Sequence, residues 1–364
     1  MKSVHVAIQS KDDVLTDPDV LPHLDDAGRP TLRTIAYIAG VHVSTVSRVL
    51  SPSLAPGVRV ASAKTTEKIR KIARDLDFTK NPHAAGLRTS RSNLVGVLVP
   101  RLTDIVLATI YEGISESARA QGYQTVVTNT HDEQQLRDDA VDMLLARRVD
   151  GLVVGDAVVD DDALAHALEK RDLPFVLVSR RSGTHPSVTC DDNEGGRLAA
   201  RHLLELGHTE VGLVAGEPYA STSVDRGGGF LEVYAAAGHP IPESRIVRCP
   251  FDVAGGRTAT DRLLSAQHPP TGIFAVNDFA AIGALGAIRA AQLRVGSDVA
   301  VVGYNDTPLA GQLPVPLTSV RSPMHEMGVR AMELLTDRIN GVDVESVRLM
   351  PTLSIRESSD PTRA

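Results

Sequence analysis

The chain has 364 residues, which is enough for two or three domains that each have a core of their own. Its formal net charge of −7 taken alone argues against a nucleic-acid partner, and its two cysteines have no metal-ligand spacing. No apolar run approaches the ~20 residues that cross a membrane, and the first residues lack a signal-peptide core. We therefore expect a cytoplasmic protein with reduced cysteines, neither secreted nor embedded in a membrane.

The distribution of charge reverses the first impression. Residues 31–91 hold eleven lysines and arginines against three acidic residues, a net charge of +8. Residues 1–30 have a net charge of −3, and residues 92–364 carry −12. A basic segment beside an acidic domain is typical of a protein that binds the phosphates of a nucleic acid with one end of the chain. Residues 1–30 show no periodicity, and we expect a flexible acidic tail there.

Residues 31–50 have the pattern of two short helices joined by a tight turn. Ala36 is small enough to let the helices touch, and Gly40 can adopt the left-handed conformation of the turn. Val46 and Val49 are spaced to hold the second helix on the first. The pattern predicts a helix-turn-helix, although any helical hairpin can imitate it.

The caps of these helices determine which side chains face outward. Thr31 can cap the first helix, and either His42 or Ser44 can cap the second. The residues left to face a DNA major groove are Val43, Ser44, Thr45, Ser47 and Arg48.

A third helix is predicted from Ser62 to Leu76, with apolar residues at helical spacing and basic residues elsewhere. It would close an all-α headpiece over residues 31–77. Residues 78–92 follow as a linker. Within it Asn81 is a good helix N-cap and Pro82 suits the first helical position, which predicts a short helix to Leu87. Four or five residues cannot hold a helix alone in water, so this one would need a partner.

From residue 93 onward, apolar β-branched runs alternate with helical stretches, which predicts an α/β domain with doubly wound parallel sheets over residues 93–364. The expected strands are Val95–Pro100, Thr125–Asn129, Gly151–Asp156, Phe175–Arg180, Val211–Gly216, Gly272–Asp278 and Val299–Asp306. The expected helices include Thr109–Gln121, Gln135–Arg147, Gly195–Leu206 and Phe279–Ala291. This length exceeds one compact sheet, so we expect two lobes. The chain should cross between them near 191–195, 305–306 and roughly 320–333.

Together these segments resemble the lactose-repressor (LacI/GalR) family of bacterial transcription factors, over about residues 31–357. The motifs that carry the resemblance are Ala39–Leu50, the hinge region Phe78–Arg91, Gly207–His208, Arg226–Phe230, Ala275–Ala284, and Val301–Asp306 followed by Pro316–Val320. The resemblance implies a helix-turn-helix headpiece and a two-lobed, periplasmic-binding-protein-like (type I) effector domain. It also implies a homodimer, or a tetramer built from it, that represses transcription from a near-palindromic operator.

The resemblance also assigns DNA contacts to individual residues. Residues at the positions of Val43, Ser44 and Arg48 would approach base edges, with Arg48 able to bind guanine through two hydrogen bonds. Thr45, Ser47 and the backbone near Thr31 and Leu32 would hold phosphates. In the hinge, Leu87 would enter the minor groove and kink the duplex. The hinge contacts that we expect are Asn81, His83, Ala84, Leu87 and Arg88.

Several positions depart from the family pattern. Lys80 stands where proline is usual, Ala85 and Gly86 replace larger hinge residues, His42 replaces a serine, and Thr34 replaces an aspartate. These departures bear on which half-site is read, and leave the expected DNA-binding role unchanged.

Ligands of doubly wound sheets bind beyond the carboxyl ends of the strands. The resemblance makes Arg180 and Asp278 the leading effector contacts, and an arginine fork opposite a carboxylate suits a polyol. The further candidates are Asp104, Asp156, Tyr219, Arg226, Asp252, Asn277 and Asn305. For each charged or amide candidate, a structural ion pair or a strand-end cap is an equal alternative. Val106 and Leu107 stand where the family often has a stacking aromatic pair, which leaves the ligand open: a sugar or derivative, or something smaller or acyclic.

The sequence supports two other classes of function less well. A solute-binding protein for a sugar-type ligand would share the two-lobed domain, but it would not need a basic headpiece. An enzyme is disfavoured because no phosphate-binding glycine loop, nucleophile elbow or paired His/Cys ligand set is present. Gly227–Gly229 is interpreted as a turn that enters a helix. We therefore expect no enzyme activity, cofactor or metal.

Overall fold

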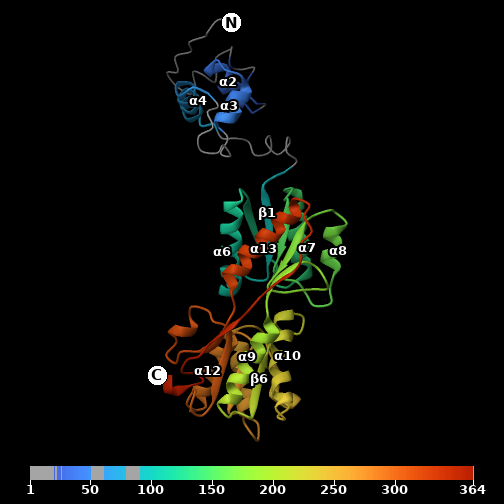
Figure 1. Ribbon diagram of the computed structural model, residues 1–364, viewed down its shortest axis with the longest axis vertical. Coiled ribbons are helices and arrows are strands. Elements are labelled where there is room, and N and C mark those ends of the chain that lie inside the picture. Colours follow the sequence, from blue (N-terminus) through green and yellow to red (C-terminus); the bar gives the residue numbers. More distant parts are fainter. Residues whose placement is uncertain (1–19, 21–22, 26, 51–60, 79–90, 364) are drawn as a thin grey trace. The chain divides into compact units, whose positions relative to one another are not determined.

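The computed structural model describes residues 20, 23–25, 27–50, 61–78 and 91–363. The chain divides into two compact units, Met1–Ser90 and Arg91–Ala364, each described here by itself (Figure 1). The expected loop at 51–60 and the hinge residues Asn81, His83, Ala84, Leu87 and Arg88 lie outside the described residues.

The described residues of the first unit form three helices, α2 (Leu32–Ala39), α3 (Val43–Val49) and α4 (Ala63–Asp75). Thr31 caps α2, because its hydroxyl accepts hydrogen bonds from the backbone N–H groups of Arg33 and Thr34. Gly40 ends α2 with φ 68°, the left-handed turn that its position predicts. The alternative for α3 is resolved in favour of His42, whose ring Nδ1 accepts from the Ser44 N–H at 3.2 Å.

The core of this unit joins all three helices. Ile35 in α2, Val46 in α3 and Ile69 in α4 are fully buried in one cluster. Val20 is also fully buried in this cluster, and Leu24 packs against it. The described part of residues 20–30 therefore differs from the expected flexible tail, because apolar side chains at its start are covered by the helices.

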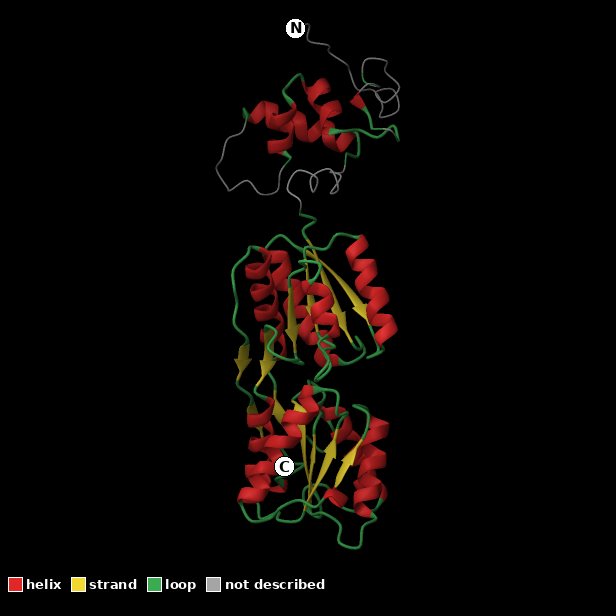
Figure 2. Ribbon diagram, turned by 90° about the vertical axis from the view of Figure 1, so that its right-hand side faces the viewer, coloured by secondary structure: helices red, strands yellow, loops and turns green. Residues whose placement is uncertain are grey.

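The second unit consists of two lobes, each built on a six-stranded sheet (Figures 1 and 2). The first sheet has the order β11-β5-β4-β3-β1-β2 and is parallel throughout. Its strands are β1 (Leu94–Val99), β2 (Gln124–Asn129), β3 (Gly151–Val154), β4 (Phe175–Val178), β5 (Ser187–Cys190) and β11 (Val347–Leu349). One face is covered by α6 (Ile105–Ala120) and α13 (Met324–Ile339), the other by α7 (Gln134–Ala146) and α8 (Ala163–Glu169).

The second lobe repeats this plan with the order β12-β10-β9-β8-β6-β7, in which only β12 runs antiparallel to its neighbour. Its strands are β6 (Val211–Ala215), β7 (Ile246–Arg248), β8 (Gly272–Ala275), β9 (Ala300–Asn305), β10 (Thr318–Arg321) and β12 (Thr352–Ser354). The covering helices are α9 (Asp192–Glu205) with α10 (Ser221–Ala236), and α11 (Val253–Leu264) with α12 (Asp278–Ala290). Three short 3-10 turns lie at Glu243–Arg245, Ala310–Gln312 and Pro361–Arg363.

The chain passes between the lobes at three places. It leaves the first lobe after β5 at Cys190, returns between β10 and α13 near 321–324, and crosses again between β11 and β12 near 349–352. The expected crossing at 305–306 is wrong, because β9 and the following β10 are neighbours in the same sheet. The short strands β11 and β12 had no long apolar run to mark the last crossing.

The run Gly227–Gly229 is not a turn, contrary to expectation, since it lies inside α10. A Cβ on Gly229 would collide with the carbonyl oxygen of Asn193 in α9, and a Cβ on Gly196 in α9 would collide with the carbonyl oxygen of Arg226. The two helices thus touch backbone to backbone. Glycine is required there for close approach, which outweighs its low helix propensity.

Both cysteines are free and buried, and burial raises the pKa of each thiol to about 11. Among the helices of the described residues, none is long and apolar enough to span a membrane.

Neighbouring glycines of α10 provide a matched pair of variants. Gly229→Ala should destabilise the second unit by about 1–3 kcal/mol, because the methyl group must push α9 away. Gly228→Ala should stabilise it by about 0.5–1 kcal/mol, since a Cβ there would only reach ordinary contact with Asn193 Nδ2 at 3.8 Å and alanine is the better helix former. Urea unfolding measures both changes, and equal effects of the two substitutions would contradict the close contact.

Candidate DNA-reading surface and ligand cleft

The outer face of α3 carries the residues expected to meet DNA. Val46 and Val49 are buried, whereas Val43, Ser44, Thr45 and Ser47 are half-buried and Arg48 is exposed. Arg48 rests on its own helix, with Nε 3.3 Å from the Ser44 carbonyl oxygen and Nη2 3.4 Å from Ser44 Oγ. These contacts are long, so an exposed guanidinium can leave them for a stronger acceptor.

The amino-terminal end of α2 carries the two residues expected to contact phosphate. Thr31 and Leu32 are half-buried, and Thr31 Oγ1 accepts hydrogen bonds from the N–H groups of Arg33 and Thr34. At the other end of α2, Lys68 Nζ donates to the Ala39 carbonyl oxygen at 3.0 Å and ties α4 to the turn. The orientation of α2 and α3 is thus set by contacts outside the reading face.

In the larger unit, polar side chains gather where the strands of the two lobes end. Arg180 follows β4 and is 8% exposed. Its Nη1 and Nη2 donate to the two carboxylate oxygens of Asp132 at 2.6 and 3.3 Å. Tyr219 of the second lobe donates to the same carboxylate at 3.3 Å, and its ring centroid lies 5.5 Å from the Arg180 guanidinium carbon. Arg180, Asp132 and Tyr219 therefore form a link between the lobes.

Arg226 of α10 is buried and fully engaged within the second lobe. Its Nε donates to Asp192 at 2.7 Å, its Nη1 donates to the Val276 carbonyl oxygen at 2.9 Å, and its guanidinium lies 3.8 Å from the ring centroid of Tyr304. Burial raises the pKa of the Asp192 carboxyl, while Arg226 acts in the opposite direction. Because a buried ion pair this well partnered joins α9, α10 and β9, Arg226 has a structural role.

Asp278 and Asn277 lie at the start of α12. The Asp278 carboxylate accepts from Ser319 Oγ at 2.6 Å and from the Thr307 N–H at 2.7 Å, and no cation pairs with it in the described residues. Burial raises the pKa of this carboxyl to about 6. Asn277 is the N-cap of α12, and its amide nitrogen donates to the Phe251 carbonyl oxygen at 3.1 Å.

Asn305 at the end of β9 is strained and incompletely bonded. Its φ of 105° lies in a region that side-chain-bearing residues rarely adopt. Only 4% of the residue is exposed, and its Oδ1 has no hydrogen-bond partner among the described residues. A buried amide oxygen without a donor is costly, and such atoms and such strain are frequent at ligand sites.

Asp104 faces this region from the first lobe. It caps α6 by accepting from the Val106 N–H at 3.0 Å. Burial raises the pKa of the Asp104 carboxyl, and the charges of Arg226 and Arg180 work against that rise. Since Arg226 belongs to the second lobe, Asp104 interacts electrostatically across the space between the lobes.

Two candidates have structural partners instead. Asp156 is fully buried and accepts from Arg137 Nε at 2.8 Å and Thr130 Oγ1 at 2.6 Å, inside the first lobe. Asp252 is exposed and caps α11 by accepting from the Gly255 N–H at 2.7 Å. Asp191 caps α9 by accepting from the Glu194 N–H at 3.0 Å.

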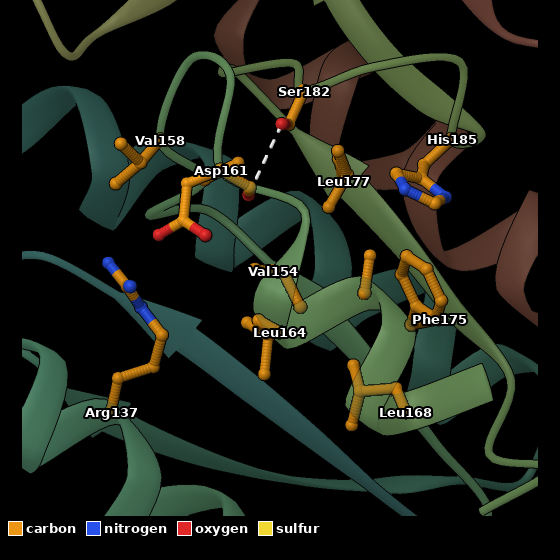
Figure 3. A pocket seen from close by; sticks show the side chains of 12 residues that line it. Arg137, Val154, Val158, Asp161, Leu164, Leu168, Phe175, Leu177, Ser182 and His185 are labelled. Carbon is orange, nitrogen blue, oxygen red and sulfur yellow. Dashed lines mark hydrogen bonds between the residues drawn. The ribbon is translucent and has the colours of Figure 1, made fainter. Parts of the chain in front are cut away.

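A small cavity lies in the first lobe, with Arg137 among the residues that line it (Figure 3). Leu164, Leu168, Leu177 and Phe175 form its apolar wall, and its volume of about 20 Å³ has room for one water. It is too small for a metabolite. No group of His, Cys, Asp or Glu within the described part of the chain could hold a metal ion.

Comparison with known proteins shows to which family the chain belongs. Residues 31–81 match the family model "Bacterial regulatory proteins, lacI family", and residues 200–359 match a periplasmic binding protein-like domain. The HTH-type transcriptional regulator DegA of Bacillus subtilis is 30% identical over 92% of this chain and 99% of its own length. The chain belongs to the LacI family.

Two solved structures resemble this chain over most of its length. The lac repressor dimer bound to operator and the anti-inducer ONPF has a TM-score of 0.81 and 28% identity, over 91% of this chain and 99% of that one. The regulator CelR in complex with cellobiose has a TM-score of 0.68 and 30% identity, over 91% of this chain and 100% of that one. The chain is thus a LacI-family DNA-binding transcriptional regulator and not an enzyme. The solute-binding alternative fails, because a lacI-family DNA-binding domain precedes the ligand-binding fold.

For this LacI-family regulator, sequence reasoning missed Asp132, which engages both Arg180 and Tyr219. Asp132 follows β2 at the same carboxyl edge as the other candidates, and that position was the available signal. The family motif could not reveal it, because the pairing depends on the loop after β2 turning back at a positive φ of 58°.

The raised pKa of Asp278 predicts how pH affects the stability of the regulator. Between about 4 and 6 the folded protein holds a proton at Asp278 that the unfolded chain releases, so stability falls as pH rises through this window. Asp278→Asn removes the buried charge. It should stabilise the protein at neutral pH by about 1–2 kcal/mol, with a gain that fades toward about pH 4.

Thermal unfolding at a series of pH values measures this difference. The control is Asp298→Asn, at a half-buried surface carboxyl whose pKa hydrogen bonds from Arg294 lower to about 2. That control should give no gain at any pH. A constant gain for Asp278→Asn across the range would rule out titration as its origin.

Proposed function

We propose that this regulator binds a near-palindromic operator as a homodimer and represses transcription, and that a small metabolite between its lobes controls operator affinity. The lac repressor structure supports the dimer and the operator, since it matches this chain over almost its whole length. Because its target is chromosomal DNA, the regulator would act in the cytoplasm on the nucleoid. A tetramer built from two dimers is the larger alternative.

On DNA, Arg48 would read a guanine, and Val43 and Ser44 would lie against neighbouring base edges. The exposed and weakly held guanidinium of Arg48 supports this role. Thr45, Ser47 and the start of α2 at Thr31 and Leu32 would contact phosphates, which fixes orientation without reading sequence. The hinge contacts Asn81, His83, Ala84, Leu87 and Arg88 remain predictions from the sequence.

The effector would lie between the ends of the strands of both lobes, in contact with Asn305, Asp278, Asp104 and Tyr219. The observation that carries this assignment is the unsatisfied Oδ1 of Asn305, which a hydroxyl donor of the ligand would satisfy. Asn277 and Arg226 would support this site through their contacts inside the second lobe. Asp156 and Asp252 are left out because their partners are structural.

The charges of the site favour an uncharged polyhydroxylated ligand. Both arginines are already paired, Arg180 with Asp132 and Arg226 with Asp192, so neither is free for an anionic ligand. Asp104 and Asp278 remain as acceptors for hydroxyl groups. CelR in complex with cellobiose is a relative with a ligand of this chemistry. A sugar or a sugar derivative therefore fits best.

The proposal is tested first on DNA. Purified protein is used to select genomic fragments, and the selected operator is compared with random DNA. Arg48→Ala should lose about 1–3 kcal/mol of discrimination between the two. Ser47→Ala is the control, because loss of a phosphate contact should weaken binding to both DNAs alike. Unchanged specificity of the Arg48 variant would end the base-reading assignment.

The effector site is tested by the response of operator binding to a panel of sugars. Asn305→Ala should weaken the response at least tenfold while ligand-free operator binding stays normal, because a group that bonds only the ligand is lost. Thr260→Val is the matched control, since Thr260 Oγ1 is another buried oxygen without a partner in the described second lobe. It lies on α11 within the helix pair, and its substitution should leave the response intact. A full response from Asn305→Ala would refute the site.

A further inference from the structure

Residues 20–30, called here the leading segment, come before the part of the chain that the lacI-family model matches, which begins at residue 31. All of them except residues 21, 22 and 26 are described. Val20 is fully buried in the same cluster as Ile35, Val46 and Ile69, and Leu24 packs on that cluster. The core of the DNA-binding unit thus includes side chains from outside the conserved family domain.

The segment has a defined turn of its own. Asp25 Oδ1 accepts from the N–H groups of Ala27 at 3.0 Å and Arg29 at 2.7 Å, and the Asp25 N–H donates to the Arg29 carbonyl oxygen at 3.0 Å. Gly28 closes the turn with φ 70°. This turn leads the chain from Val20 back to the first residue of the helix-turn-helix.

The carbonyl of His23 is the main polar contact of the segment. It accepts hydrogen bonds from Thr31 Oγ1 at 2.7 Å and from Thr34 Oγ1 at 2.6 Å. The same two hydroxyls form the cap of α2, in which Thr34 Oγ1 also accepts from the Thr31 N–H at 2.9 Å. The His23 ring lies 4.7 Å from the ring of Tyr37 on α2. Both capping hydroxyls therefore give their single proton to the leading segment.

Aspartate at position 34 is the informative comparison for this arrangement. An ionised aspartate can only accept hydrogen bonds. At this position it would leave the His23 carbonyl without one donor and would bring a negative oxygen toward it. Threonine provides both the acceptor that the cap needs and the donor that His23 needs.

We propose that residues 20–30 are a fourth element of the DNA-binding headpiece, which fixes the amino-terminal end of α2, and that Thr34 is the residue by which the headpiece holds it. The end of α2 carries Thr31 and Leu32. If Thr31 and Leu32 contact DNA phosphates as proposed above, the segment positions a contact with the DNA backbone and not with a base. This last consequence rests on the proposed DNA contacts, whereas the structural role of the segment does not.

The first experiment deletes parts of the amino terminus and follows hydrogen–deuterium exchange. Removing residues 1–19 should leave exchange in residues 31–50 unchanged. Removing residues 1–30 should speed it roughly tenfold or more, because two hydrogen bonds and a buried valine are lost. Peptides from residues 91–363 serve as the internal control. Equal exchange in the two deletions would overturn the proposal.

The second experiment tests Thr34 through a change of sign. In the full chain, Thr34→Asp should speed exchange of α2, because the carboxylate opposes the His23 carbonyl. In the chain that lacks residues 1–30 the same substitution should slow exchange, because the carboxylate then only caps the helix and complements its dipole. An effect of the same sign in both chains would show that Thr34 does not serve the segment.

If the longer deletion does not fold, variants of the full chain still test the role of Thr34. Thr34→Ser keeps a hydroxyl and should exchange as the unaltered protein does, whereas Thr34→Asp should not. Equal exchange in these two variants would overturn the proposal. Thr34→Asp should lower the affinity of the protein for operator and for random DNA by the same factor. This result would differ from the loss of specificity expected for Arg48→Ala.

Discussion

Backbone-to-backbone contact between paired helices constrains the whole larger unit. In three pairs, α6 with α13, α9 with α10 and α11 with α12, a glycine of each helix lies against a backbone carbonyl of the other. The glycine and carbonyl partners are Gly113 with His325, Gly328 with Ile110, Gly196 with Arg226, Gly229 with Asn193, Gly256 with Ala280 and Gly283 with Val253. Any side chain at these points would force the helices apart. The helix starts that carry Asp104, Asp192 and Asp278 are thereby fixed at the edges of the sheets.

These fixed helix starts concentrate buried polar groups, and their partners differ. Asp192 has Arg226, and Asp132 has Arg180, so their charges are compensated. Asp278 has only neutral donors, and burial raises its pKa accordingly. Asn305 Oδ1 has no hydrogen-bond partner within the described part of the chain, and the Asn305 backbone is strained. Asp278 and Asn305 differ from the ion pairs beside them, because their buried polar side chains have no charged partner among the described residues.

The sequence was sufficient where local chemistry decides the structure. Thr31, Gly40, Val46 and Val49 act as their positions predict, because caps, turns and a helical stripe are local. The long apolar strands of both sheets were also predicted. Two lobes were expected because the α/β region is too long for one compact sheet. The short strands β5, β7, β10, β11 and β12 lacked such runs, and α10 was hidden by glycines that serve packing with α9. The contacts of Asp132, Val20 and His23 join residues through tertiary folding, which periodicity does not report.

The coupling between the two proposed sites has a physical limit set by how the lobes are joined. Three chain crossings keep the lobes together, so they can change their angle but cannot separate. Beyond the crossings, polar links join them, including Arg181 with Asp225, Tyr219 with Asp132, and Cys190 with Tyr304. A ligand can shift the lobes only by the difference in its affinity for the two arrangements. Arg181–Asp225 is partly exposed, and partly exposed ion pairs contribute little to the free energy that holds the lobes in one arrangement.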